Sequence, residues 1–285
     1  MRVLKTVILA ASTLALGANA ASAQEQFYGS AGIELSHLDI NGDPIGGTEA
    51  TNYKIGKLQL SMGREIGRSG YVQIDLRHSR TTNFGVSSDT YNAGTLGVLR
   101  AGTETGQRSW GGFLGAALTD QDDDSTSTSF RTIYGFEGAL NLNSGLALTG
   151  QLGRIEGTGG SDGLDSIRGA TFARVNMDYG LSDISSVSLD IAGAFGVMDT
   201  GNDDVSVAAV TLGYERILRD PNKILHASVS RTIYNQYAEA DVLGETQFSF
   251  GFNFKFGNSK KQPKTTRTGL APVEEWIAQT GGPME

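Results

Sequence analysis

Apolar and polar residues alternate at every second position in one segment after another of this chain. Residues 71–77 place Val72, Ile74 and Leu76 on one parity and Gln73, Asp75 and Arg77 on the other. Residues 57–62 and 167–179 repeat the pattern. Because successive side chains of a strand point to opposite faces, this period predicts strands with one apolar face and one wet face.

Twelve such segments follow one another along the chain. They cover residues 27–38, 53–64, 71–78, 95–103, 110–118, 130–142, 146–156, 167–179, 184–198, 205–216, 224–234 and 246–256. All five prolines lie outside these segments, which fits the assignment because proline cannot donate to a strand ladder. The predicted fold is all-β and antiparallel, with about twelve strands and with ten to fourteen possible.

The connections between the segments also alternate in character. The even-numbered ones are tight or charge-balanced turns, such as residues 143–145 and 219–223. The odd-numbered ones, counted over residues 39–52, 79–94, 119–129, 157–166, 199–204 and 235–245, hold sixteen Asp or Glu against the single basic residue Arg80. Short turns on one side and longer loops on the other are typical of transmembrane up-and-down β-barrels. A soluble β-sandwich is the alternative, but it has no reason to segregate loop charge in this way.

The beginning of the chain predicts export. Arg2 and Lys5 precede an apolar stretch over residues 7–16, and residues 21–23 read Ala-Ser-Ala, which is the layout of a cleaved signal peptide over residues 1–23. An uncleaved anchor is the alternative, but the apolar stretch is shorter than the roughly 20 residues that a spanning helix needs. Cysteine is absent, so disulfides and thiolate metal sites are excluded. Cleavage removes two positive charges and changes the formal net charge from -8 to -10, which argues against nucleic acid as a partner.

Residues 247–256 read Gln-Phe-Ser-Phe-Gly-Phe-Asn-Phe-Lys-Phe, so five aromatic rings share one face of a predicted strand. Such a face suits lipid, and the opposite polar face suits a hydrated lumen. Ser249, Gly251, Phe254 and Phe256 resemble the assembly signature of Gram-negative outer-membrane β-barrel proteins, a polar residue, a glycine and two alternating aromatics at the end of the last strand. That signature usually ends the chain, whereas 29 residues follow Phe256 here.

The resemblance covers residues 24–256 as a barrel and leaves residues 257–285 as a periplasmic tail. It implies a place in the outer membrane of a Gram-negative bacterium, among outer-membrane lipid and lipopolysaccharide, with the barrel-assembly machinery as a partner. Within this class the chain is similar to the porins of alphaproteobacteria, although its third loop, about residues 119–129, is too short to fold deeply into the lumen. The implied function is a porin-like channel for passive diffusion of small hydrophilic solutes or ions, without a cofactor. A structural or adhesive barrel with a closed lumen is the alternative, and the oligomeric state stays open.

Charged residues on the wetter parity are the candidates for setting ion preference in the lumen. They are Glu34, Lys57, Asp75, Arg77, Arg131, Glu137, Arg168, Arg174, Asp178, Asp190, Glu215 and Lys255. Charges paired across a filled interior are the competing interpretation. Eight-stranded barrels are packed shut and those of 16 to 18 strands leave an aqueous channel, so twelve strands fall between the two cases.

One histidine and one serine have the spacing of a catalytic base and its nucleophile. His226 and Ser228 share a strand face, as a base and its nucleophile do in outer-membrane phospholipase A and lipid A deacylases. Their neighbours Leu225, Ala227 and Val229 form the apolar face, which predicts that His226 and Ser228 point into the lumen and away from lipid. A lipid hydrolase is therefore the lesser alternative, and no enzymatic activity is expected.

Two further features have an ordinary interpretation and a functional one. The acidic runs at residues 122–124 and 203–204 could hold divalent cations, but solvated surface charge explains them equally, and no specific metal site is predicted. The tail carries Lys260, Lys261 and Lys264 and then a helix start at Pro272, so it is expected either to be mobile or to form a short helix near the pore mouth.

Overall fold

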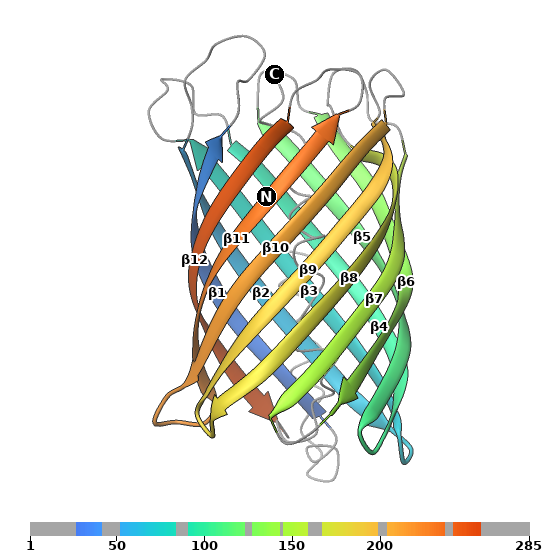
Figure 1. The fold of residues 1–285 in the computed structure, drawn as a ribbon. Helices are drawn as coiled ribbons and strands as arrows, with labels where there is room; N and C mark the ends of the chain where they lie inside the picture. Colours follow the sequence, from blue (N-terminus) through green and yellow to red (C-terminus); the bar gives the residue numbers. More distant parts are fainter. Residues whose placement is uncertain are drawn as a thin grey trace.

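The computed structural model describes residues 27–41, 52–83, 91–122, 127–142, 145–158, 167–198, 204–236 and 242–257, whose strands form one closed antiparallel barrel (Figure 1). The strands are β1 (Phe27–Asn41), β2 (Asn52–Ile66), β3 (Gly70–Asn83), β4 (Tyr91–Thr105), β5 (Arg108–Asp122), β6 (Ser127–Asn141), β7 (Leu146–Thr158), β8 (Ile167–Ser182), β9 (Ser185–Met198), β10 (Asp204–Ile217), β11 (Lys223–Gln236) and β12 (Val242–Gly257). Each pairs with its neighbours in sequence, and β1 pairs with β12. Closure leaves no strand edge unpaired, which a bilayer requires.

All twelve predicted segments are strands, and most are longer than predicted. β4 begins at Tyr91 instead of near residue 95, and β5 ends at Asp122 instead of near residue 118. Much of the predicted third loop therefore belongs to β5 and β6. The β-sandwich alternative is wrong, because one sheet closes on itself. The predicted signal peptide over residues 1–23 and the tail after Gly257 lie outside the described residues.

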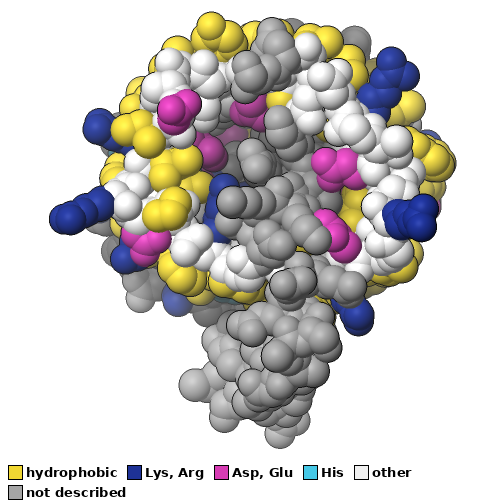
Figure 2. Space-filling model, turned by 90° about the horizontal axis from the view of Figure 1, so that it is seen from below, with side chains coloured by type: hydrophobic (Ala, Val, Ile, Leu, Met, Phe, Trp, Pro, Cys, Tyr) yellow, Lys and Arg dark blue, Asp and Glu magenta, His cyan; other side chains and the backbone are white. Residues whose placement is uncertain are grey.

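The outward face of the barrel is apolar. Leu35, Trp110 and Phe136 are 71%, 68% and 75% exposed, and Phe248, Phe250 and Phe254 project from the same face of β12. In Figure 2 hydrophobic side chains follow the outer rim. Soluble proteins rarely expose so continuous an apolar surface, whereas a bilayer covers it. No helix in the described part of the chain is long and apolar enough to cross a membrane.

The short turns gather at one end of the barrel, here called the turn side, and the opposite end is the loop side (Figure 1). Gly67 and Gly106 adopt positive φ angles of 64° and 61° in two of these turns, a backbone conformation that suits glycine. In the β10–β11 turn, the Asp220 carboxylate accepts a hydrogen bond from the Asn222 backbone N–H at 3.0 Å. This bond, together with Lys223, lowers the pKa of Asp220 below its ordinary value. Local chemistry thus stabilises the turns.

Candidate functional site

The predicted lumen charges lie on strands, on the parity that faces the interior. Lys57, Arg131, Glu137, Arg174 and Asp190 are buried there, and Glu34, Asp75, Arg77, Asp178 and Lys255 are partly buried. Glu215 faces the interior near the turn side and is exposed. Arg168 lies at an irregularity of β8, and its side chain is not among those described. The role of these residues in ion preference stays a prediction.

Arg100 on β4 links two of the predicted carboxylates. Its Nε donates to Asp75 Oδ2 of β3 at 2.5 Å, and its Nη1 donates to Glu137 Oε2 of β6. Arg100 and Glu137 side chains are fully inaccessible to solvent. A buried pair of this kind is costly to break, because removal of one partner leaves an uncompensated charge. Arg100 therefore holds β3, β4 and β6 together on the inward face.

Tyr71 of β3 reaches Glu137 of β6 by passing over two glycines, one in β4 and one in β5. The ring of Tyr71 on β3 lies across Gly102 and Gly111, since a Cβ added at either glycine would approach the Tyr71 hydroxyl to 2.7 or 2.8 Å. This hydroxyl reaches Glu137 Oε1 at 3.4 Å. Because Gly102 and Gly111 have no side chain, the Tyr71 side chain can extend over β4 and β5 on the inward face.

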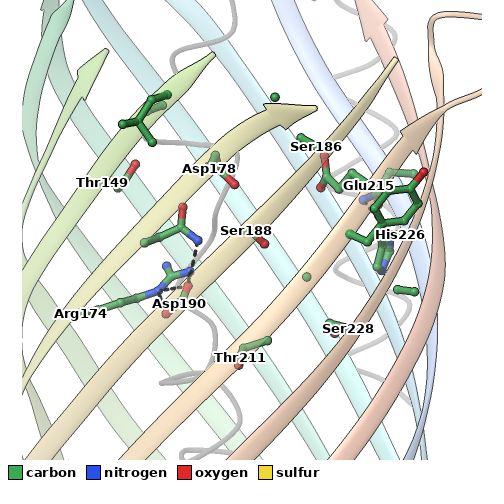
Figure 3. Close-up of a pocket in the computed structure, with 18 of the residues that line it drawn as sticks. Thr149, Arg174, Asp178, Ser186, Ser188, Asp190, Thr211, Glu215, His226 and Ser228 are labelled. Carbon is green, nitrogen blue, oxygen red and sulfur yellow. Dashed lines mark hydrogen bonds and ion pairs between the residues drawn. The ribbon is translucent and has the colours of Figure 1, made fainter. Parts of the chain in front are cut away.

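The contacts continue from Glu137 to β9. Gln151 Nε2 on β7 donates to Glu137 Oε2 at 3.1 Å, and Arg174 Nη1 on β8 donates to Gln151 Oε1 at 3.1 Å. Arg174 Nε also donates to both carboxylate oxygens of Asp190 on β9, at 2.9 and 2.8 Å (Figure 3). Bidentate arginine–carboxylate bonds fix both side chains in one orientation.

A second group of contacts lies around Glu34 on β1. Lys57 Nζ is 3.0 Å from Glu34 Oε1, and His226 Nε2 is 3.0 Å from Glu34 Oε2. The other ring nitrogen of His226 is 3.4 Å from Asn253 Nδ2, and Asn253 contacts Gln59 of β2. Together with the Arg100 and Arg174 groups, these contacts form what we call the polar belt.

A cavity of about 340 Å³ lies on the turn side of the polar belt (Figure 3). Its charged lining consists of Glu34, Asp178, Asp190 and Glu215 against Arg174 and His226. The lining also includes hydroxyl groups, from Thr149, Ser186, Ser188, Thr211 and Ser228. We call this cavity the inner vestibule. It is polar, carries more carboxylates than cations and is wide enough for several water molecules.

Much of the loop-side half of the interior is apolar, although Arg131 and Glu245 are buried there as well. Thirteen buried apolar side chains from eight consecutive strands, β4 to β11, form one cluster, here called the apolar wall: Leu96, Val98, Phe113, Ala117, Ile133, Ile155, Ala170, Phe172, Ala192, Ala194, Val207, Ala209 and Tyr234. The predicted alternation of one apolar and one wet face therefore does not hold for these residues, which are apolar and face inward. On β4 both parities are apolar, so alternation could not reveal which face points inward.

Arg100 and Glu245 are interior residues that sequence reasoning missed. Arg100 shares its parity with Leu96 and Val98, so it stood on an apparently apolar face. The Arg100 guanidinium carbon lies 5.8 Å from the centroid of the Phe113 ring, at the boundary between polar belt and apolar wall. Glu245 was placed in a loop, but β12 begins earlier, and its side chain is 3% exposed and accepts a bond from the Tyr234 hydroxyl at 3.3 Å.

The histidines do not form the arrangement of a lipid hydrolase. His226 and Ser228 face the interior, as their apolar neighbours indicated, and both line the inner vestibule. The His226 ring nitrogens contact Glu34 and Asn253. His78 lies on the outward parity of β3 and contacts Thr95 at 3.0 Å. Within the described ranges, no three His, Asp or Glu side chains gather closely enough to hold a metal ion.

The four residues of the assembly signature have structural roles as well. Ser249 Oγ lies 2.9 Å from Ser36 Oγ across the β1–β12 closure, and the Phe254 ring is exposed on the outward face. A side chain at Gly251 would overlap the His226 ring and lie 2.6 Å from the Ile33 carbonyl oxygen. On the outward face, Phe256 lies over Gly29 of β1. Recognition by the assembly machinery stays a prediction.

No family model and no curated protein matches the chain. Among solved structures, an outer membrane channel from Pseudomonas putida F1 aligns with a TM-score of 0.59 at 12% identity, over 81% of this chain and 96% of that one. The translocator domain of autotransporter NalP from Neisseria meningitidis has a TM-score of 0.52 at 12% identity, over 88% and 97%. The β domain of the Bordetella autotransporter BrkA has a TM-score of 0.51 at 13% identity, over 81% and 100%.

The chain has the fold of outer-membrane β-barrel proteins. At 12–13% identity these likenesses show a shared fold and no more. The proteins that share this fold include a channel and two autotransporter domains. Function must therefore be argued from the lumen itself. The narrower resemblance to porins of alphaproteobacteria stays a prediction.

Proposed function

We propose that this chain is a channel of the Gram-negative outer membrane that admits small hydrophilic solutes or ions by passive diffusion. The inner vestibule carries the proposal, because a polar cavity of about 340 Å³ inside a membrane barrel is a place for water and dissolved solutes. The apolar outward face supports a location in the outer membrane, since lipid would cover it. Export by the predicted signal peptide is part of the same proposal.

The charges of the inner vestibule favour cations. Four carboxylates line it against one arginine and one histidine. Glu34 and Asp190 are each bonded to a basic partner, whereas Glu215 is exposed and adds its negative charge to the field near the turn-side opening. In Figure 2, seen from below, carboxylates lie inside the hydrophobic rim. A low-dielectric wall lined by one sign of charge raises the local concentration of counter-ions.

Reconstitution of the folded, full-length protein into a planar bilayer tests the proposal. We expect stepwise conductance and, in a salt gradient, a reversal potential of the sign for cation preference. A folded and inserted sample that shows no conductance steps would contradict the channel function. Heat-modifiable gel mobility of the same sample establishes that the barrel is folded.

A barrel with a closed lumen is the second candidate, and the polar belt favours it. Arg100 bridges β3 and β6 across the inward face, and the Arg174 group continues to β9. Such contacts resemble the packed interior of smaller barrels. The same bilayer experiment separates the candidates, because a structural or adhesive barrel inserts without conducting.

A further inference from the structure

Two glycines leave a groove in the outward face of the barrel. Gly138 of β6 and Gly150 of β7 lie opposite one another, and the same row continues to Trp110 of β5 on one side and to Val175 of β8 on the other. Trp110 and Val175 are 68% and 56% exposed, so their side chains form the raised sides of the groove. The groove holds about 520 Å³ of free space.

The floor of this groove is backbone. A Cβ added at Gly138 or Gly150 would meet a single backbone carbonyl oxygen within 4 Å, at 3.4 Å and 4.0 Å respectively. At Gly29, another outward glycine, the ring of Phe256 occupies the corresponding space. No side chain of the described residues covers Gly138 and Gly150 in this way. A molecule outside the chain therefore has to fill the groove in a membrane, because an unfilled void loses contacts on every side.

A positive charge lies at the turn-side end of the groove. Arg108 is the first residue of β5, and it is the one charged member among the described residues that line the groove. Its side chain is exposed, and it shares the outward parity of Trp110, two residues further along the strand. Figure 2, which shows the turn side, has further Lys and Arg side chains at the outer rim. Long basic side chains at the end of a membrane-spanning element reach the level of the lipid headgroups.

The charge of Arg108 decides between two kinds of occupant. If a second copy of the barrel covered the groove about a two-fold axis, the two Arg108 side chains would approach one another beside the hydrocarbon layer, where repulsion is strong. A phospholipid instead brings a phosphate to the guanidinium, which forms charge-assisted hydrogen bonds with it. Its acyl chain can then lie over Gly138 and Gly150. A lipid therefore fits both ends of the groove.

We propose that this groove is a binding site for an anionic phospholipid of the leaflet on the turn side, with the phosphate on Arg108 and one acyl chain over Gly138 and Gly150. In outer-membrane barrels the short turns are periplasmic, so this leaflet is the periplasmic one. An anionic headgroup is preferred because a zwitterionic headgroup carries an ammonium group that the arginine repels. The site rests on the place of the barrel in a membrane and is independent of the proposed channel function.

Trp110 can report which lipid occupies the groove. The chain has two tryptophans, so Trp276→Phe leaves Trp110 as the single one in the full-length protein. This protein is folded into phosphatidylcholine vesicles that contain either brominated phosphatidylglycerol or brominated phosphatidylcholine, because bromine on an acyl chain quenches a neighbouring indole. We expect phosphatidylglycerol to bind beside Trp110 about fivefold more strongly, the factor that one basic residue contributes near anionic lipid. Equal quenching by the two lipids would overturn the proposal, and protection of Trp110 from both would assign the groove to a second copy.

Two pairs of variants separate the phosphate contact from the groove. Arg108→Gln should remove the preference for phosphatidylglycerol, whereas Arg216→Gln, which changes an exposed arginine on the outward face of β10, should leave it unchanged. Gly150→Leu fills the groove and should also remove the preference. Its control is Gly193→Leu on the outward face of β9, where a Cβ would likewise meet a single carbonyl oxygen, at 3.5 Å.

An undiminished preference in Gly150→Leu would show that Arg108 attracts anionic lipid without the groove, and it would contradict the site. Heat-modifiable gel mobility establishes that each variant is folded. A barrel that shows the lipid preference but no conductance steps keeps this site, whereas the channel function then fails.

Discussion

The two halves of the lumen differ in chemistry although the same strands build both. On the turn side, carboxylates, hydroxyls and amides line the inner vestibule, and the polar belt bounds it. On the loop side, β4 to β11 present alanines, aliphatic residues and aromatic rings to the same interior. The outward face, in contrast, is apolar in both halves. Contact with lipid thus explains the apolar residues of the outward face, whereas the inward residues differ between the two halves of the lumen.

The first prediction tests whether the polar belt holds the barrel together. Arg100→Ala leaves Asp75 and Glu137 without their shared guanidinium, so we expect a loss of about 3–5 kcal/mol in the free energy of unfolding. Urea unfolding in lipid vesicles measures it. Arg154→Ala is the matched control, because the Arg154–Glu156 pair is about half exposed on the outward face, and such pairs contribute at most about 1 kcal/mol. Equal losses from both substitutions would show that the belt contributes no more than a surface pair.

The apolar wall should respond to truncation as a packed core does. Phe172 is 1% exposed and lies 6.2 Å from Phe113 between ring centroids. Phe172→Ala should lower the free energy of unfolding by about 3 kcal/mol, through lost burial and a new cavity. Phe136→Ala, from the outward face, should cost clearly less, because lipid refills the space. A wall that tolerates Phe172→Ala without loss would indicate that this half of the lumen is loosely filled.

Much of the fold and part of the lumen followed from the sequence. The outward rings of β12 and the inward set of β3 were predictable, because lipid imposes one chemistry on every second residue. Arg100 was not, since its neighbours Leu96 and Val98 belong to the apolar wall and share its face. Glu245 was missed because the predicted strand began at residue 246, whereas β12 begins at Val242, and the alternation carries no sharp signal for where a strand starts. Contacts between strands distant in sequence, such as Glu34 with His226, depend on closure and leave no local signal.

Gly251 offers a smaller effect that separates packing from assembly. Gly251→Ala places a methyl group against the His226 ring and 2.6 Å from the Ile33 carbonyl oxygen, so we expect a loss of about 1–3 kcal/mol. Gly56→Ala is the control, because a Cβ there meets nothing within 4 Å. Urea unfolding of the refolded proteins gives both values. Normal stability of Gly251→Ala, with a defect confined to insertion in cells, would assign the glycine to assembly alone.

The smallest expected effect concerns ion preference. Glu215→Gln removes an exposed charge from the inner vestibule, and screening by salt limits its influence to roughly twofold in the cation-to-anion permeability ratio. Reversal potentials in a salt gradient measure the ratio. The control, Glu156→Gln, removes a carboxylate from the outward face and should leave the ratio unchanged. An increase in cation preference on removal of Glu215 would contradict the assigned field of the vestibule.

Water access along single strands tests the central claim most directly, that inward residues on the turn side touch water and outward residues touch lipid. Single cysteines at Ser188 and Ser228, which line the inner vestibule, should react with a water-soluble maleimide in lipid vesicles. Cysteines at Leu212 and Phe250, exposed on the outward face, should react only after the barrel is unfolded. Reaction at Leu212 and Phe250 with protection at Ser188 and Ser228 would reverse the two faces and contradict the account.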